Sequence, residues 1–147
     1  MADQVLRFAP KDWLLLLFHD AGKPIDRIRI QKSMFLFAQR SKASEQEKYQ
    51  FEPYDYGPFC SAIYSDLARF EASGLIRKED GARSPAYSLT TLGRAAAGRL
   101  AESVPAERLS YLQQVRSWVL VRSFNQLLTD VYEMYPDYAV RSVFKQQ

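Results

Sequence analysis

The chain has little of what metal and thiol chemistry require. Its 147 residues include one cysteine, Cys60, and one histidine, His19. A lone cysteine cannot close an internal disulfide, and one residue of each kind excludes a Cys/His metal cluster. Cys60 and His19 also lack the local Asp or Asn signature that would orient a nucleophile and its base. We therefore expect a non-enzymatic protein in a reducing cytoplasm, with no cofactor and no metal.

Long apolar runs and phosphate-binding glycine motifs are missing as well. The longest apolar run, Trp13 to Phe18, has six residues, whereas a helix that spans a bilayer needs about 20. No charged-then-apolar leader opens the sequence, so we expect neither secretion nor a membrane partner. The absence of a GxGxxG or Walker sequence excludes the two commonest phosphate-cradling loops.

The composition is that of an ordinary globular domain. Hydrophobic residues make up 47%, aromatic residues 14% and charged residues 25% of the chain, which is enough apolar material for a packed core. Twenty basic residues against 17 acidic ones give a net charge of +3. A surplus of this size permits DNA binding without arguing for it.

Apolar residues recur at helical spacing through most of the chain. This periodicity predicts helices over residues 11–20, 26–40, 59–73, from Thr90 or Thr91 to about 102, 109–119 and 123–135. The first of these segments is apolar nearly all round, which is typical of a helix in the middle of a fold. In the second, Gln31 falls on the apolar side, so we expect its side chain to be partly buried and hydrogen-bonded.

Two short half-apolar segments, 75–79 and 86–90, flank a loop that contains Gly81, and together they predict a β-hairpin. Three helices followed by a hairpin is the element order of a winged helix-turn-helix. We expect a mostly α fold with a small β-hairpin: a winged helix-turn-helix core over 1–103 and a C-terminal helical extension over 104–147, in one compact domain. Pro53 argues against a central strand, and Gly57-Pro58 predicts a turn that starts the third helix.

Candidate DNA contacts lie on three of these elements. In a winged helix the third helix enters the major groove and the wing follows the phosphate backbone. The candidates are Ser61, Ser65 and Arg69 on the third helix; Arg77, Lys78 and Arg83 on the wing; and Arg29, Lys32 and Arg40 on the outer stripe of the second helix. A solvated face is the commoner role of such a charged stripe, with phosphate contact as the alternative. Acidic neighbours of Arg69 make the third helix a poor surface for sequence-specific readout.

Residues 66–76 and 87–93 resemble the recognition-helix and wing stretch of MarR- and PadR-type regulators. The shared features are the Gly74-Leu75-Ile76 ending of the third helix, a charged loop, and then Leu89-Thr90 with Gly93. This likeness covers about 30 residues and implies a winged helix.

A second resemblance involves Ile30-Gln31-Lys32, residues 51–59 and residues 127–138. These segments are similar to the uncharacterised YwgA-type bacterial family, and their Gln-Lys and Tyr-Gly-Pro signatures are similar to antitoxin domains of the Panacea (SocA-like) type. The likeness implies a bacterial protein with a helical winged fold, but no firm activity. The chain departs from the pattern at Ile30, where leucine is usual, and at Cys60, where serine is common.

Two functions therefore stay open. The first is a DNA-binding, transcriptional-regulator-like protein that contacts double-stranded DNA. The second is a protein-interaction module of the antitoxin or defence-accessory kind, whose partner is a toxin or another defence component. Its contact surface would be the aromatic cluster Tyr54, Asp55, Tyr56 and Phe59, which otherwise serves as a structural turn.

The last predicted helix carries a broad apolar stripe. Its candidate dimer residues are Phe124, Leu128, Val131, Tyr132 and Tyr135. This stripe is wider than packing against one neighbouring helix requires. It therefore predicts a two-fold contact between copies through residues 106–135. The alternative is that these helices fold back over the apolar first helix.

Overall fold

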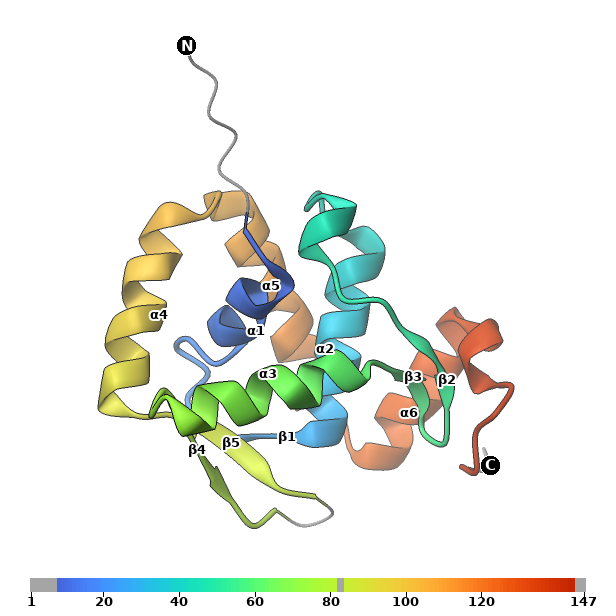
Figure 1. The fold of residues 1–147 in the computed structure, drawn as a ribbon. Helices are drawn as coiled ribbons and strands as arrows, with labels where there is room; N and C mark the ends of the chain where they lie inside the picture. The colour runs from blue at the N-terminus through green and yellow to red at the C-terminus, as the bar shows by residue number, and fades with distance from the viewer. Residues whose placement is uncertain (1–7, 82–83, 145–147) are drawn as a thin grey trace.

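The structure, a computed structural model, describes residues 8–81 and 84–144 (Figure 1). Its helices are α1 (Pro10–Leu17), α2 (Arg27–Arg40), α3 (Ser61–Ala72), α4 (Thr91–Ser103), α5 (Ala106–Leu120) and α6 (Phe124–Met134), with short 3-10 turns η1 (Glu45–Glu47) and η2 (Pro136–Ala139). Its strands are β1 (Ile25–Asp26), β2 (Glu52–Tyr54), β3 (Gly57–Phe59), β4 (Ile76–Glu79) and β5 (Ala86–Leu89). No helix in the described part of the chain is long and apolar enough to cross a membrane.

A three-stranded sheet in the order β1-β5-β4 forms the wing. β4 and β5 pair antiparallel, with Lys78 opposite Tyr87, and β1 pairs antiparallel with the other edge of β5. With α1, α2 and α3 this sheet makes a winged-helix core, to which α4, α5 and α6 are added (Figure 1). The predicted fold class is confirmed, and the predicted hairpin is correct to within one residue at each end.

α1 lies at the centre of the molecule. The side chains from Trp13 to Phe18 are all buried, and α1 packs against α3, α4 and α5. Neighbours on several sides explain why this helix carries no polar face, as its sequence predicts. The buried guanidinium of Arg116 on α5 caps the C-terminal end of α1. It donates hydrogen bonds to the carbonyls of Leu17, His19 and Asp20.

The connection between α2 and α3 differs from the prediction. Residues 41–60 form η1 and the two-stranded hairpin β2–β3 (Figure 1). Pro58 lies in β3 opposite Pro53, and α3 begins at Ser61 instead of Phe59. Proline is tolerated here because a two-stranded hairpin has free edges, where a missing N–H breaks no ladder.

The predicted basic outer stripe of α2 is wrong at Lys32. The side chains of Lys32 and Ser33 are buried, at 3% and 0% exposure. α2 packs against α5 and also against β3, so it has two covered faces where the sequence pattern suggested one. Gln31 is buried and hydrogen-bonded, as predicted.

The C-terminal helices pack on the winged-helix core of the same chain. α5 lies against α1 and α2, and α6 lies against β3. Of the candidate dimer residues, Leu128, Val131 and Tyr132 are buried within the single chain, which corrects the expectation that they form an outer contact surface. The hairpin β2–β3 and η2 supply cover that the helical pattern alone did not reveal.

Candidate nucleic-acid interface

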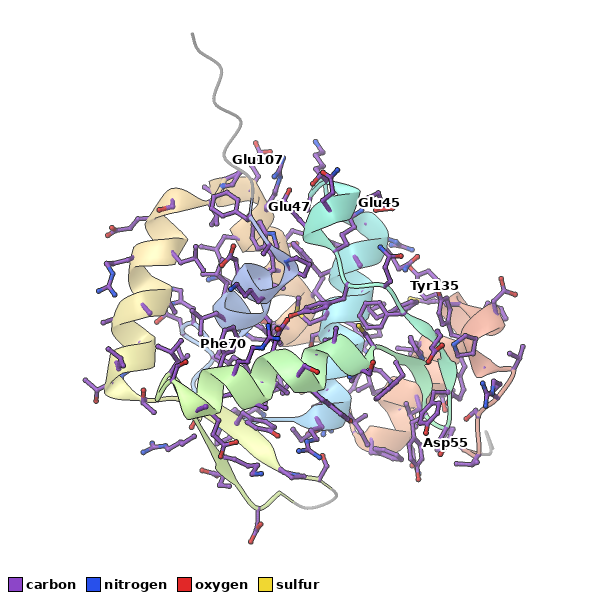
Figure 2. All side chains as sticks on the ribbon, viewed as in Figure 1. Glu45, Glu47, Asp55, Phe70, Glu107 and Tyr135 are labelled. Atoms are coloured by element: carbon purple, nitrogen blue, oxygen red, sulfur yellow. The ribbon has the colours of Figure 1, made fainter. Side chains whose placement is uncertain are left out.

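α3 has one face open to solvent. Its buried side is formed by Ile63, Leu67 and Phe70, and Figure 2 shows Phe70 near the C-terminal end of the helix. The opposite side is exposed and small, with Ser61, Ala62, Ser65, Ala68, Arg69 and Ala72. Small side chains let a helix backbone approach a groove closely. The three α3 candidates therefore lie on the open face, as predicted.

Arg69 is the cation of this open face. Its side chain is 79% exposed, and its guanidinium lies 4.0 Å from the Asp66 carboxylate. Asp66 is itself engaged, because it accepts a 2.7 Å hydrogen bond from the Tyr49 hydroxyl. A pair this long and this exposed is weak, so Arg69 is available for an anionic partner.

The two described wing cations lie on opposite faces of the sheet. Lys78 faces Tyr87 across the strands, whereas Arg77 pairs with Ser88 on the other face and lies 3.4 Å from its hydroxyl. Both side chains are exposed. Arg83, the third wing candidate, lies outside the described residues. Of these two cations, only Lys78 lies on the same face of the sheet as Tyr87, and the Tyr87 ring is on the side of the sheet nearer to α3.

Arg27, which the sequence analysis missed, connects α3 to the wing. Its guanidinium lies 4.8 Å from the ring of Tyr64 on α3 and donates a 3.0 Å hydrogen bond to the hydroxyl of Tyr87 on β5. Burial raises the pKa of Tyr64, an effect that the nearby Arg27 charge opposes. Helical periodicity gives no signal for this role, because Arg27 is positioned by the pairing of β1 with β5.

The α2 candidates do not form one surface. Arg29 is held by Asp26, 2.7 Å away, and by the carbonyl of Arg122. Lys32 donates to the carbonyl of Pro58, and burial lowers its pKa to about 7. Arg40 is exposed at the opposite end of α2, roughly 20 Å along the helix axis from its start. None of the three therefore joins the open face of α3.

The Gln-Lys and Tyr-Gly-Pro signatures meet at one place, which we term the signature junction: Gln31, Lys32, residues 57–60 and Tyr132. Gln31 exchanges two hydrogen bonds with the backbone of Cys60, and Lys32 bonds to Pro58. Gly57 has φ +90°, and a Cβ there would lie 2.7 Å from the Tyr132 ring. These contacts give the signatures a structural role, which is to fix the hairpin onto α2 and α6.

The aromatic cluster of the hairpin is partly exposed. Tyr54 and Tyr56 are 43% and 42% exposed, and Asp55 lies at the exposed hairpin tip (Figure 2). Phe59 is half-buried, with its ring stacked 4.9 Å from that of Tyr54. The backbone of Asp55 is tied to the C-terminal segment, since its carbonyl accepts a bond from the Val143 N–H. The cluster is thus both a structural turn and an accessible rim.

The described residues hold no cluster of metal ligands, and no hydrogen bond or ion pair joins Cys60 to His19. No group of three or more His, Cys, Asp or Glu side chains in residues 8–81 and 84–144 is arranged to hold a metal ion. Cys60 is buried at the start of α3. His19 instead lies 3.4 Å from Asp20 at the end of α1, and the described contacts do not join it to Cys60.

The sequence matches no protein-family model and no curated protein. Among solved structures, the chain is similar to a point mutant of Lactococcus lactis ZitR. The two are 14% identical, the match covers 92% of this chain and 76% of that chain, and the TM-score is 0.40. A likeness at this level transfers neither fold nor function.

Proposed function

We propose that the chain is a non-enzymatic, regulator-like protein that binds double-stranded DNA through α3 and the wing. The observation that carries the proposal is the open face of α3, lined with small side chains and joined to the wing by Arg27. A helix with one side free of the rest of the chain, beside an exposed hairpin, suits a major groove and its adjacent phosphates.

The described candidates on α3 and β4 that share this surface have distinct roles in the proposal. The Ser61 and Ser65 hydroxyls would contact base edges, and the Arg69 guanidinium would bind guanine or a phosphate. Lys78, exposed on β4 and on the same sheet face as Tyr87, would contact phosphates. Acidic side chains next to these cations limit the electrostatic attraction, so we expect modest, strongly salt-dependent affinity with weak sequence preference.

Fluorescence anisotropy with a mixed-sequence duplex tests the proposal. Binding is expected at roughly 10 µM protein in low salt, with affinity falling steeply as salt rises. Lys78→Ala is expected to weaken binding to all sequences alike and to reduce the salt slope by about one. The matched control is Arg99→Ala, which removes an exposed cation from α4, outside the α3–wing face. Absence of binding, or equal losses for Lys78→Ala and Arg99→Ala, contradicts the proposal.

A protein partner is the second candidate function, favoured by the exposure of Tyr54 and Tyr56. Large aromatic side chains that stay accessible are typical anchors of protein interfaces. In this alternative a toxin or another defence component contacts Tyr54, Asp55, Tyr56 and Phe59. The test is binding to the product of an adjacent toxin gene. Binding that is lost in Tyr56→Ser but kept in Lys78→Ala supports the protein-partner function. DNA binding that is lost in Lys78→Ala but kept in Tyr56→Ser supports the DNA-binding function.

A further inference from the structure

A groove runs between α2, α5 and α6, with no residue of α3 or the wing in its walls. It consists of two cavities of about 210 and 590 Å³ that share Arg40 and Tyr111. The smaller cavity is mainly apolar, and its walls include Leu36, Val115, Trp118, Met134 and Tyr135. The larger cavity is basic, with Lys42 and Arg108 beside Arg40. The groove therefore changes from apolar to cationic along its length.

The apolar end has accessible hydrophobic surface. Met134 is 41% exposed, and Trp118 is half-buried with the Arg122 guanidinium 3.5 Å from its ring centroid. Below them lie Leu36 and Val115, both buried. A ligand that covers Met134 and Trp118 removes apolar surface from water, which favours binding.

The basic end has cations without anionic partners. Arg40 and Lys42 are exposed, and within the described part of the chain neither lies within 4 Å of a carboxylate. Arg108 differs, because it lies 3.7 Å from the buried carboxylate of Glu47. The carboxylate in the wall at this end is that of Glu107. Positive charge therefore exceeds negative charge here.

Arg40 joins the two ends. It lines both cavities together with Tyr111. Burial raises the pKa of the Tyr111 hydroxyl, and the Arg40 charge acts on it in the opposite direction. The Arg40 guanidinium thus lies close to the ring that separates the apolar part from the basic part. Glu107 lines the basic cavity and Tyr135 lines the apolar cavity, and both residues are labelled in Figure 2.

We propose that this groove binds a small organic anion with an apolar body, of the acyl-carboxylate class. The carboxylate would lie between Arg40 and Lys42, and the apolar body against Trp118 and Met134. The two cavities together fall in the usual range for small-molecule sites, about 300–1,000 Å³. This site is separate from the proposed DNA surface, so it does not depend on that function.

Titration with decanoate tests the site directly, without DNA. Binding is followed by calorimetry and by tryptophan emission, where Trp118 reports on the groove and the fully buried Trp13 gives a constant background. Decanoate is expected to change the emission, and Trp118→Phe is expected to abolish the change while calorimetric binding persists. Decyltrimethylammonium, with the same chain length and the opposite charge, is expected to bind at least tenfold more weakly.

Two variants test the two ends of the groove. The double variant Arg40→Ala/Lys42→Ala is expected to weaken decanoate binding at least tenfold, because it removes both cations that would flank the carboxylate; tenfold corresponds to about 1.4 kcal/mol. Arg99→Ala, which removes an exposed cation elsewhere, is its control. Met134→Glu places a carboxylate at the apolar end. It is expected to weaken binding about tenfold, or by about 1.4 kcal/mol, because a charged side chain replaces an apolar contact with the ligand. Val121→Glu is the control, because Val121 is exposed outside the groove.

Several outcomes overturn the proposal. These are no heat and no emission change with decanoate, equal affinity for decanoate and decyltrimethylammonium, or unchanged affinity in the Arg40→Ala/Lys42→Ala variant. Light scattering supplies a further overturning outcome. If the mass of the wild type doubles with concentration and the Met134→Glu variant stays at 17.0 kDa, a second copy of the chain fills the groove.

Discussion

The side-chain amide of Gln31 forms two hydrogen bonds with the backbone of Cys60, one from its nitrogen to the carbonyl and one to its oxygen from the N–H, each 2.9 Å long. Both residues are buried. Because an amide both donates and accepts, glutamine satisfies the two backbone groups at the start of α3 at once. This pair fixes the end of the β2–β3 hairpin against α2, at the place where a helix-turn-helix usually has a short turn.

Gln31→Ala is expected to destabilise the chain by roughly 1–3 kcal/mol. The substitution leaves the buried N–H of Cys60 without a partner, at about 1–3 kcal/mol, whereas the Cys60 carbonyl keeps its 3.2 Å hydrogen bond from the N–H of Ile63. Urea unfolding measures the loss. Gln39→Ala on the exposed side of the same helix is the control and is expected to change stability by less than about 0.5 kcal/mol. Equal effects at the two positions refute the bonding role.

Lys32 is expected to make stability rise with pH above neutrality. Burial lowers its folded pKa from 10.5 to about 7, so between these values the unfolded chain binds a proton that the folded chain does not. The free energy of unfolding then increases with pH, by about 2 kcal/mol between pH 7 and 9. The measurement is urea unfolding of wild type and Lys32→Met across this range.

Relative to Lys32→Met, wild type is expected to gain stability as pH rises. The control is Lys42→Met, since Lys42 is exposed and its removal leaves the pH dependence of wild type unchanged. Parallel curves for wild type and Lys32→Met contradict the prediction.

Gly57→Ala is expected to cost about 3 kcal/mol. About 1 kcal/mol comes from the positive φ, and the rest comes from forcing a Cβ to within 2.7 Å of the Tyr132 ring, since overpacking costs about 1–3 kcal/mol. Gly22→Ala separates the two effects, because Gly22 has φ +81° and nothing within 4 Å of the added carbon. Thermal or urea unfolding of both variants checks the difference, and equal losses rule out the contact with Tyr132.

Arg116→Met is expected to destabilise the chain by about 3 kcal/mol. Methionine keeps much of the apolar stem but removes the guanidinium that bonds to the carbonyls of Leu17, His19 and Asp20, and unpaired buried acceptors cost about 1–3 kcal/mol. Arg99→Met on the exposed side of α4 is expected to be nearly neutral in the same unfolding measurement. A neutral Arg116→Met shows that water replaces the guanidinium.

Leu128→Asp is expected to unfold or strongly destabilise the single chain, since it buries a charge in a site with 0% exposure. Leu92→Asp is the control, at a side chain that is 55% exposed. The two-fold contact through 106–135 stays a prediction, which light scattering across a concentration series checks. A dimer that Leu128→Asp converts to a stable, folded monomer contradicts the interior position of Leu128.

Much of the fold follows from local patterns in the sequence. The apolar periodicity of each helix, the all-apolar α1 and the half-apolar segments around Gly81 depend on residues near one another in the chain. Burial of Gln31 also follows, because it lies on the apolar side of α2. The small exposed face of α3, with Ser61 and Ser65, is the other side of the same pattern.

Tertiary packing decided what local patterns cannot express. Lys32 is buried because β3, which begins 25 residues later in the chain, covers a second face of α2. Arg27 connects α3 to the wing because β1 pairs with β5, and Leu128 is interior because the β2–β3 hairpin and η2 cover α6. A periodicity records that a helix has a buried side, but it does not record how many neighbours a helix has. That number depends on contacts between residues distant in sequence, and here it determined which cations remain available to a partner.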